Sequence, residues 1–184
     1  STPKPSSAAS DVYKRQSPDY DPSVHYPVSF QDVPMDAWYR NELGYCVQAG
    51  IITGRPDGNF APMESIDRGE LAAMAARFLE LANSGSTSAF ADVPASYWAH
   101  GYIAQLAEKG IVNGNGQGLY LPTEAISRAE TVRIVNGILD RRPGQADEAT
   151  LDRLAAAGAF IDLDKTHWAY YEILEATYDH QHQK

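Results

Sequence analysis

Apolar residues recur three or four positions apart in two kinds of segment, and each kind occurs twice along the chain. This spacing places them on one face of an α-helix, so the pattern predicts amphipathic helices. The first kind has Leu43, Cys46 and Val47, then Ile103, Leu106 and Ala107; the second has Met74, Ala75, Phe78 and Leu79, then Ile134, Val135, Ile138 and Leu139. We therefore expect an all-α protein.

These helices belong to a duplicated unit, because the chain matches itself at a shift of 60 residues without a gap. The matching pairs include Phe30 and Phe90, Asp32 and Asp92, Trp38 and Trp98, Gly50 and Gly110, Gly54 and Gly114, Arg68 and Arg128, and Glu70 and Glu130. A third start follows at a shift of 70, where Phe160, Asp162 and Trp168 keep the same spacing. We expect repeats at 30–82 and 90–142 and a partial third repeat at 150–184, packed around a shared core.

The segments outside the repeats have a different composition. Residues 83–88 and 141–150 are small and polar, which predicts linkers. Residues 1–29 carry Pro, Ser, Asp and Tyr without a period, so we expect them to be mostly disordered.

Each repeat is predicted to run helix, glycine-rich loop, helix. Asp36, Ser96 and Thr166, each two residues before a tryptophan, are the expected N-caps of the first helices. Gly50 and Gly110 suit the left-handed position after those helices. The second helices open with two capping boxes, formed by Asp67 with Glu70 and by Ser127 with Glu130.

Arg68 and Arg128 occupy the first helical position, where the helix dipole is positive and disfavours a cation. One interpretation is a carboxylate or phosphate ligand held by the arginine and the helix N-terminus. The other is an ion pair with a nearby carboxylate such as Asp32 or Asp92. The sequence leaves both open.

Trp38, Trp98 and Trp168 also have two interpretations. They could anchor the repeats in the core, or they could leave one ring face open as a platform for a sugar. The residues alone favour core packing by a small margin.

Composition narrows the function. The formal charge of −9 and the pI near 4.9 argue against nucleic acid and against an anionic membrane surface. The single cysteine, Cys46, is interpreted as a small buried apolar residue. No run of apolar residues is long enough to span a membrane. Neither a catalytic acid–base pair nor a metal-ligand spacing is evident, so the sequence indicates no enzyme, no metal and no cofactor.

The repeated residues resemble the S-layer homology domain over about residues 30–179. The matching pieces are Phe30-Gln31-Asp32-Val33 to Trp38, Asp57-Gly58-Asn59-Phe60, Ile66-Asp67-Arg68-Gly69-Glu70 and, as a closer match, Ile126-Ser127-Arg128-Ala129-Glu130. Residues 160–184 are similar to the family's closing half-copy.

The resemblance implies a non-catalytic, extracellular module that holds exported proteins on the cell wall of a Gram-positive bacterium. Family members form a three-pronged pseudo-trimer whose grooves bind secondary cell-wall polysaccharide, often through a pyruvyl carboxylate. Carried over, this assigns carboxylate contact to Arg68 and Arg128, with Trp38, Trp98, Trp168, Asp32, Asp92, Gly54 and Gly114 as candidate groove contacts. The anchored domain is expected on a longer chain upstream. The alternative is a helical scaffold that binds a protein and no glycan.

The sequence departs from the family pattern at several positions. Asp67 and Gly69 stand where Thr and Ala are usual, and Gln117 stands where Asp is usual. Counting half-repeats gives three tryptophan helices and two arginine helices, so we expect a pseudo-three-fold bundle that lacks one helix.

Overall fold

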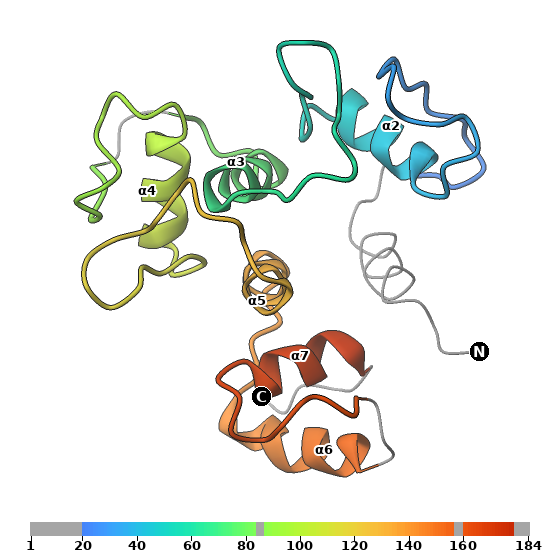
Figure 1. Ribbon diagram of the computed structural model, residues 1–184. Coiled ribbons are helices and arrows are strands. Elements are labelled where there is room, and N and C mark those ends of the chain that lie inside the picture. Colours follow the sequence, from blue (N-terminus) through green and yellow to red (C-terminus); the bar gives the residue numbers. More distant parts are fainter. Residues whose placement is uncertain (1–19, 84–86, 157–159, 179–184) are drawn as a thin grey trace. The chain divides into compact units, whose positions relative to one another are not determined.

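The computed structural model describes residues 20–83, 87–156 and 160–178. Within these ranges the protein is all-helical, as the sequence predicted, and has no strand beyond one isolated bridge between Asp67 and Ala125. The helices are α2 (Arg40–Gln48), α3 (Arg68–Phe78), α4 (His100–Glu108), α5 (Arg128–Ile138), α6 (Gln145–Ala155) and α7 (Tyr170–Thr177), shown in Figure 1. The chain divides into an N-terminal unit, residues 17–126, and a C-terminal unit that contains residues 127–184.

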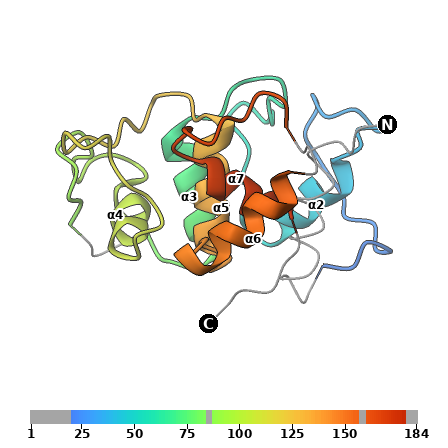
Figure 2. The ribbon, with the colours of Figure 1, turned by 90° about the horizontal axis from the view of Figure 1, so that it is seen from below.

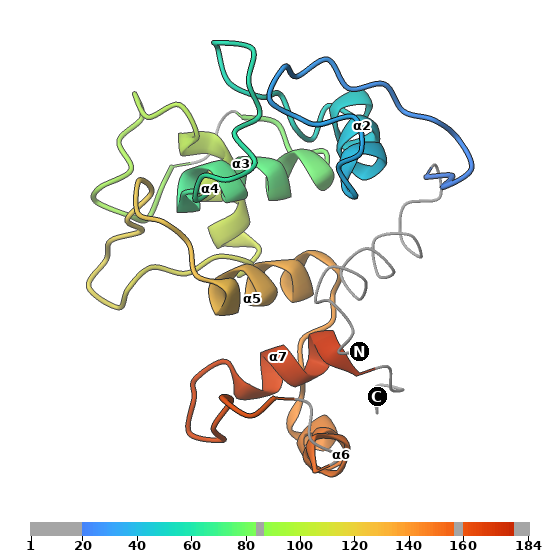
Figure 3. The same cartoon turned by 45° about the vertical axis from the view of Figure 1, so that its right-hand side comes forward.

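Helices pack across the repeat boundaries. The second helix of one repeat lies against the first helix of the next, α3 against α4 and α5 against α7. Figure 3 shows α3 beside α4 within the N-terminal unit. Each two-helix core is therefore made from halves of two successive repeats.

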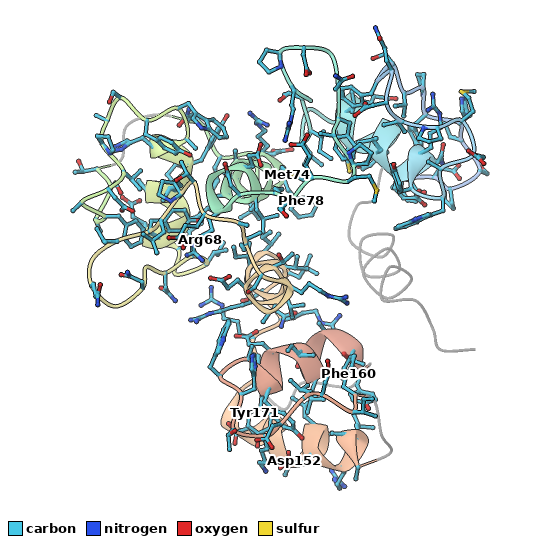
Figure 4. The ribbon with its side chains drawn as sticks, in the orientation of Figure 1. Arg68, Met74, Phe78, Asp152, Phe160 and Tyr171 are labelled. Atoms are coloured by element: carbon cyan, nitrogen blue, oxygen red, sulfur yellow. The ribbon has the colours of Figure 1, made fainter. Side chains whose placement is uncertain are left out.

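The α3–α4 core is built on small residues. Four buried alanines line α3, namely Ala72, Ala73, Ala75 and Ala76, and they let α4 approach closely. From α4, Ile103 and Leu106 are both fully buried. The predicted apolar face of α3 was therefore only partly correct, because Met74 and Phe78 are half-buried while the alanine face forms the core (Figure 4).

The first helices begin later than predicted, and Asp36, Ser96 and Thr166 are not their N-caps. The N-cap residues are Tyr39, Ala99 and Ala169, and none caps with its side chain. In α4 the missing acceptor comes from the preceding segment, because Asn83 Oδ1 accepts from the Tyr102 amide at 3.3 Å. Asn83 also donates to the Trp98 carbonyl at 2.7 Å, so this stretch fixes the helix start as well as linking repeats.

Part of the N-terminal stretch expected to be disordered packs on α2. Tyr20 and Tyr26 are buried, and their rings lie 5.2 and 5.3 Å from that of Tyr45. Asn41 holds the same stretch by accepting from the Tyr26 amide at 3.0 Å and donating to the Val24 carbonyl at 3.0 Å. Residues 20–29 are thus structured, and the rest of the expectation, for residues 1–19, lies outside the described residues.

The predicted linker at 141–150 was also wrong, because α6 begins inside it at Gln145. The larger shift of the third repeat, 70 instead of 60, makes room for this extra helix. Leu151 of α6 is fully buried, and Asp152 accepts from Tyr171 of α7 at 3.4 Å and from Lys165 at 2.5 Å. Figure 2 and Figure 4 show α6 lying against α7.

The helix C-termini differ in how well their residues suit a left-handed backbone. Gly50 and Gly110 follow α2 and α4 with φ of 72° and 65°, as predicted. After α3 and α5 the same conformation falls on Glu80 and Asp140, with φ of 56° and 52°. A side chain with a Cβ costs energy at these two positions.

Replacing Glu80 with glycine is expected to raise the free energy of unfolding by about 0.5–1 kcal/mol, because glycine adopts positive φ without the Cβ penalty. Urea denaturation followed by circular dichroism measures this. The matched control is Glu108→Gly at the end of α4, where the backbone is helical and the same change should destabilise by about 1 kcal/mol. Equal effects at the two positions would contradict the prediction.

Candidate functional site

The side chain of Arg68, in repeat 1, hydrogen-bonds to the glycine loop of repeat 2, residues 113–124. Its Nε donates to the Tyr120 carbonyl at 2.7 Å and its Nη2 to the Asn113 carbonyl at 3.2 Å. Its guanidinium also lies over the Tyr120 ring, 4.8 Å from the centroid. In return the Tyr120 hydroxyl donates to the Arg68 carbonyl at 3.0 Å. The side chain, labelled in Figure 4, is therefore fixed in place before any ligand arrives.

The first turn of α3 is tied to the same loop by its backbone. The backbone amide of Arg68 donates to the Glu124 carbonyl at 3.0 Å, and that of Gly69 donates to the Pro122 carbonyl at 2.8 Å. A Cβ at Gly69 would lie 2.5 Å from the Tyr97 hydroxyl. Gly69 therefore lies close against Tyr97 of the second repeat.

Asp32 and Asp92 bind backbone amides. The Asp92 carboxylate accepts from the amides of Tyr120 at 2.9 Å and Leu121 at 2.7 Å. Asp32 accepts in the same way from the amides of Phe60 at 2.9 Å and Ala61 at 2.6 Å. The Phe60 hydrogen bond, helped by that from Ala61, holds the pKa of the Asp32 carboxyl below its usual range.

These contacts bear on the ion-pair interpretation of Arg68. The hydrogen bonds described for Arg68 go to loop carbonyls, and those described for Asp32 and Asp92 go to loop amides. Each aspartate shapes the loop, and in repeat 2 that loop positions Arg68.

Arg128 has different surroundings. It is exposed, and within the described ranges its side chain makes no hydrogen bond or ion pair. Its position at the start of α5 follows from the capping box, in which Glu130 accepts from the Ser127 amide at 2.9 Å. The matching box of Asp67 and Glu70 opens α3. The two arginines therefore occupy the same position in their helices but differ in their contacts. The Arg68 side chain is hydrogen-bonded to a loop, and the Arg128 side chain is exposed.

The tryptophans are open to solvent, so the expectation that they pack in the core was wrong. Trp38 is 71% exposed, Trp98 49% and Trp168 56%. They sit in the turns before the first helices, where the ring projects away from the core that the following helix residues form. Three equivalent aromatic rings are thus presented at the surface.

Gly54 and Gly114 have a packing role in the loops. A Cβ at Gly54 would collide with the Phe30 ring, and one at Gly114 would lie 2.8 Å from the Phe90 ring. Those rings stack on Phe60 and Tyr120, with centroids 5.7 and 5.3 Å apart. The glycines let each loop close over its aromatic pair.

Sequence reasoning missed two participants. Tyr120 was not singled out, although its match at the 60-residue shift is Phe60 and the added hydroxyl is a readable difference. Arg133, whose guanidinium lies over the Trp168 ring, gave no signal because its match is Ala73. No cluster of three metal-ligating side chains occurs in the described part of the chain, and none of its helices is long and apolar enough to cross a membrane.

Residues 29–72 and 89–132 match the model of the S-layer homology domain. The chain carries two S-layer homology domains. Each match ends inside the second helix of its repeat, so it includes Arg68 or Arg128. Residues 160–178 lie outside both matches.

Similar proteins contain this region as one part of a longer chain. A cellulosome-anchoring protein of Acetivibrio thermocellus is 30% identical over 161 residues, 84% of this chain and 34% of that protein. S-layer protein EA1 of Bacillus anthracis is 37% identical over 102 residues, 55% of this chain and 12% of that protein. An amylopullulanase of Thermoanaerobacterium thermosulfurigenes is 37% identical over 123 residues, 63% of this chain and 6% of that protein. The chain thus spans about a third or less of these relatives, whose names are those of an anchoring protein, an S-layer protein and an enzyme.

Proposed function

We propose that this S-layer homology region is a non-catalytic anchor that tethers an exported protein to the bacterial envelope by binding secondary cell-wall polysaccharide. The observation that carries the proposal is the exposure of Trp38, Trp98 and Trp168 at one equivalent position in all three copies. The same exposed ring recurs at one position of each copy, and the C–H face of a sugar suits an open indole ring. The names of the relatives, a cellulosome-anchoring protein and an S-layer protein, support a place at the cell surface.

The polysaccharide is expected to be anionic, with a carboxylate such as a pyruvyl ketal. The chain's charge of −9 repels a polyanion at long range, so recognition needs a local cation. Arg128 is the better candidate contact, because it is exposed and its side chain has no partner in the described residues, whereas Arg68 already holds the loop. Arg68 would contribute at the edge of its loop, with its geometry set by Tyr120.

Replacing Arg128 with glutamine is expected to weaken binding to purified cell-wall sacculi about ten-fold, since a charge-assisted hydrogen bond to a carboxylate contributes about 1.5–3 kcal/mol. Co-sedimentation over a range of sacculus concentrations measures the affinity. Arg142→Gln is the matched control, because Arg142 is also exposed and carries the same charge. The control should bind as the unchanged chain does.

Two treatments of the sacculi separate the proposal from a scaffold that binds a wall protein. Protease digestion should leave binding intact, and chemical removal of pyruvyl groups should reduce it to the level of the Arg128→Gln variant. Loss of binding after protease would show a protein partner. Equal binding by all variants with and without pyruvyl groups would show that the carboxylate contact is wrong.

A further inference from the structure

Three asparagines of the chain are followed directly by glycine, namely Asn113, Asn115 and Asn136. In such a pair the backbone nitrogen of the glycine can attack the side-chain carbonyl carbon of the asparagine, because glycine has no Cβ to obstruct the approach. The side chain then loses ammonia and becomes a carboxylate. Since the dipeptide is the same at all three positions, differences in reactivity among them come from the fold.

The fold protects Asn136. This residue lies in α5 and is 2% exposed, and its Nδ2 donates to the Glu172 carboxylate at 2.8 Å and to the Glu172 carbonyl at 2.9 Å. Within a helix the backbone nitrogen of the following glycine donates to the carbonyl four residues back and cannot turn toward the side chain. Asn136 can therefore react only after its helix has unfolded.

Asn113 is exposed, but the peptide that follows it is held on both sides. The Asn113 carbonyl accepts from Arg68 Nη2 at 3.2 Å. A Cβ at Gly114 would lie 2.5 Å from the Leu119 carbonyl oxygen, so there is little free space around this glycine. Turning the peptide between Asn113 and Gly114 toward the side chain requires the contact with Arg68 to open first.

Asn115 has the surroundings that the reaction needs. Both Asn115 and Gly116 are exposed, and a Cβ at Gly116 would meet no atom within 4 Å. Asn115 Oδ1 accepts from the backbone amides of Gln117 at 2.9 Å and Leu119 at 3.3 Å. Negative charge develops on this oxygen when the side-chain carbonyl is attacked, and two amides directed at it stabilise that charge as an oxyanion hole does.

We infer that Asn115 is a site of spontaneous deamidation in the glycine loop of repeat 2. The Gly116 nitrogen gives its proton to hydroxide and bonds to Asn115 Cγ, while the carbonyl π electrons move to Oδ1. Collapse of this intermediate breaks the Cγ–Nδ2 bond and releases ammonia, which takes a proton from water. Water then opens the five-membered succinimide at either carbonyl and leaves aspartate or isoaspartate. The sum consumes one water and releases one ammonia, with no oxidant or reductant.

The loop can hold the product aspartate. In repeat 1, Asp57 makes a turn of the same kind, because its carboxylate accepts from the Asn59 amide at 3.0 Å. Gly58 follows Asp57 with φ of 83°, as Gly116 follows Asn115 with φ of 81°. Deamidation to aspartate therefore adds a negative charge to the loop without removing the acceptor that its turn needs.

The test follows the folded whole chain during incubation at neutral pH, with mass spectrometry of its peptides measuring conversion at each asparagine. Asn115 should convert about ten-fold or more faster than Asn113, where a hydrogen bond to a charged group has to open. It should convert about 10³-fold or more faster than Asn136, which reacts only from an unfolded population. In concentrated guanidinium chloride the three asparagines should react at similar rates, because the fold no longer distinguishes them.

Two matched variants identify the reacting residue. Asn115→Gln should stop the fast conversion, because glutamine would have to close a six-membered ring, and Asn113→Gln should leave it unchanged. Both side chains are exposed, so both variants should fold, and circular dichroism checks this. Conversion of Asn113 or Asn136 as fast as that of Asn115 in the folded chain would overturn the inference. So would rates that stay as different in guanidinium chloride as they are in the folded chain.

Discussion

Replacing Arg141 with methionine is expected to lower the free energy of unfolding of the C-terminal unit by about 3 kcal/mol. Arg141 Nε pairs with Glu175 Oε1 at 3.3 Å, and its Nη2 donates to the Glu175 carbonyl at 3.1 Å. Glu175 is fully buried, so removing the arginine takes away a positive charge that compensates the buried carboxylate. Guanidinium denaturation followed by circular dichroism measures the loss.

The neighbouring Arg142 supplies the matched control. Arg142 is exposed, and Arg142→Met should change the stability by less than about 0.5 kcal/mol. Adding Glu175→Leu to Arg141→Met should restore much of the stability, because the buried charge is then gone. A double variant as unstable as Arg141→Met alone would show that the arginine stabilises through packing and not through the carboxylate.

Replacing Asp92 with alanine is expected to destabilise the N-terminal unit by about 2–3 kcal/mol and to weaken sacculus binding. The change removes two charge-assisted hydrogen bonds, to the Tyr120 and Leu121 amides, and leaves the loop without its acceptor. Because Tyr120 also carries the carbonyl that fixes Arg68, the arginine should lose its set position together with the loop. Thermal denaturation and co-sedimentation measure the two effects.

Asp162, the match of Asp92 in the third copy, is the control for this experiment. It is exposed, and its side chain accepts no hydrogen bond in the part of the chain that the structure describes. Asp162→Ala should therefore leave the stability unchanged within about 0.5 kcal/mol. A cost similar to that of Asp92→Ala would mean that the aspartate acts through something other than the loop amides.

The repeat and its helices could be predicted from the sequence because their signals are local. The capping boxes at Asp67 and Ser127 lie within four residues, and both helices begin next to them. The first helices lack such a box. Their starts were misplaced because the acceptor for α4 is Asn83, 19 residues upstream, and a distant side chain leaves no local pattern.

The candidate site was predicted in its residue types but not in its partners. The sequence predicted the position of Arg68 at the start of its helix. It could not predict the hydrogen-bond acceptors of Arg68, because these are backbone carbonyls of another repeat, and every residue has a backbone carbonyl. The exposure of the tryptophans could not be read either, since an aromatic residue near a helix start fits both a core and a surface. Only the fold shows that Trp38, Trp98 and Trp168 project outward.

The sequence repeat and the packed helix pair are different units of this chain. In both pairs, α3 with α4 and α5 with α7, the second helix of one repeat packs against the first helix of the next. A duplication copies residues 30–82, whereas the helices that exclude water from each other come from adjacent copies. Because each pair joins helices from adjacent copies, the first helix of a copy has this packing partner only when the preceding copy is present. An excised single repeat would hold neither of these two helix pairs.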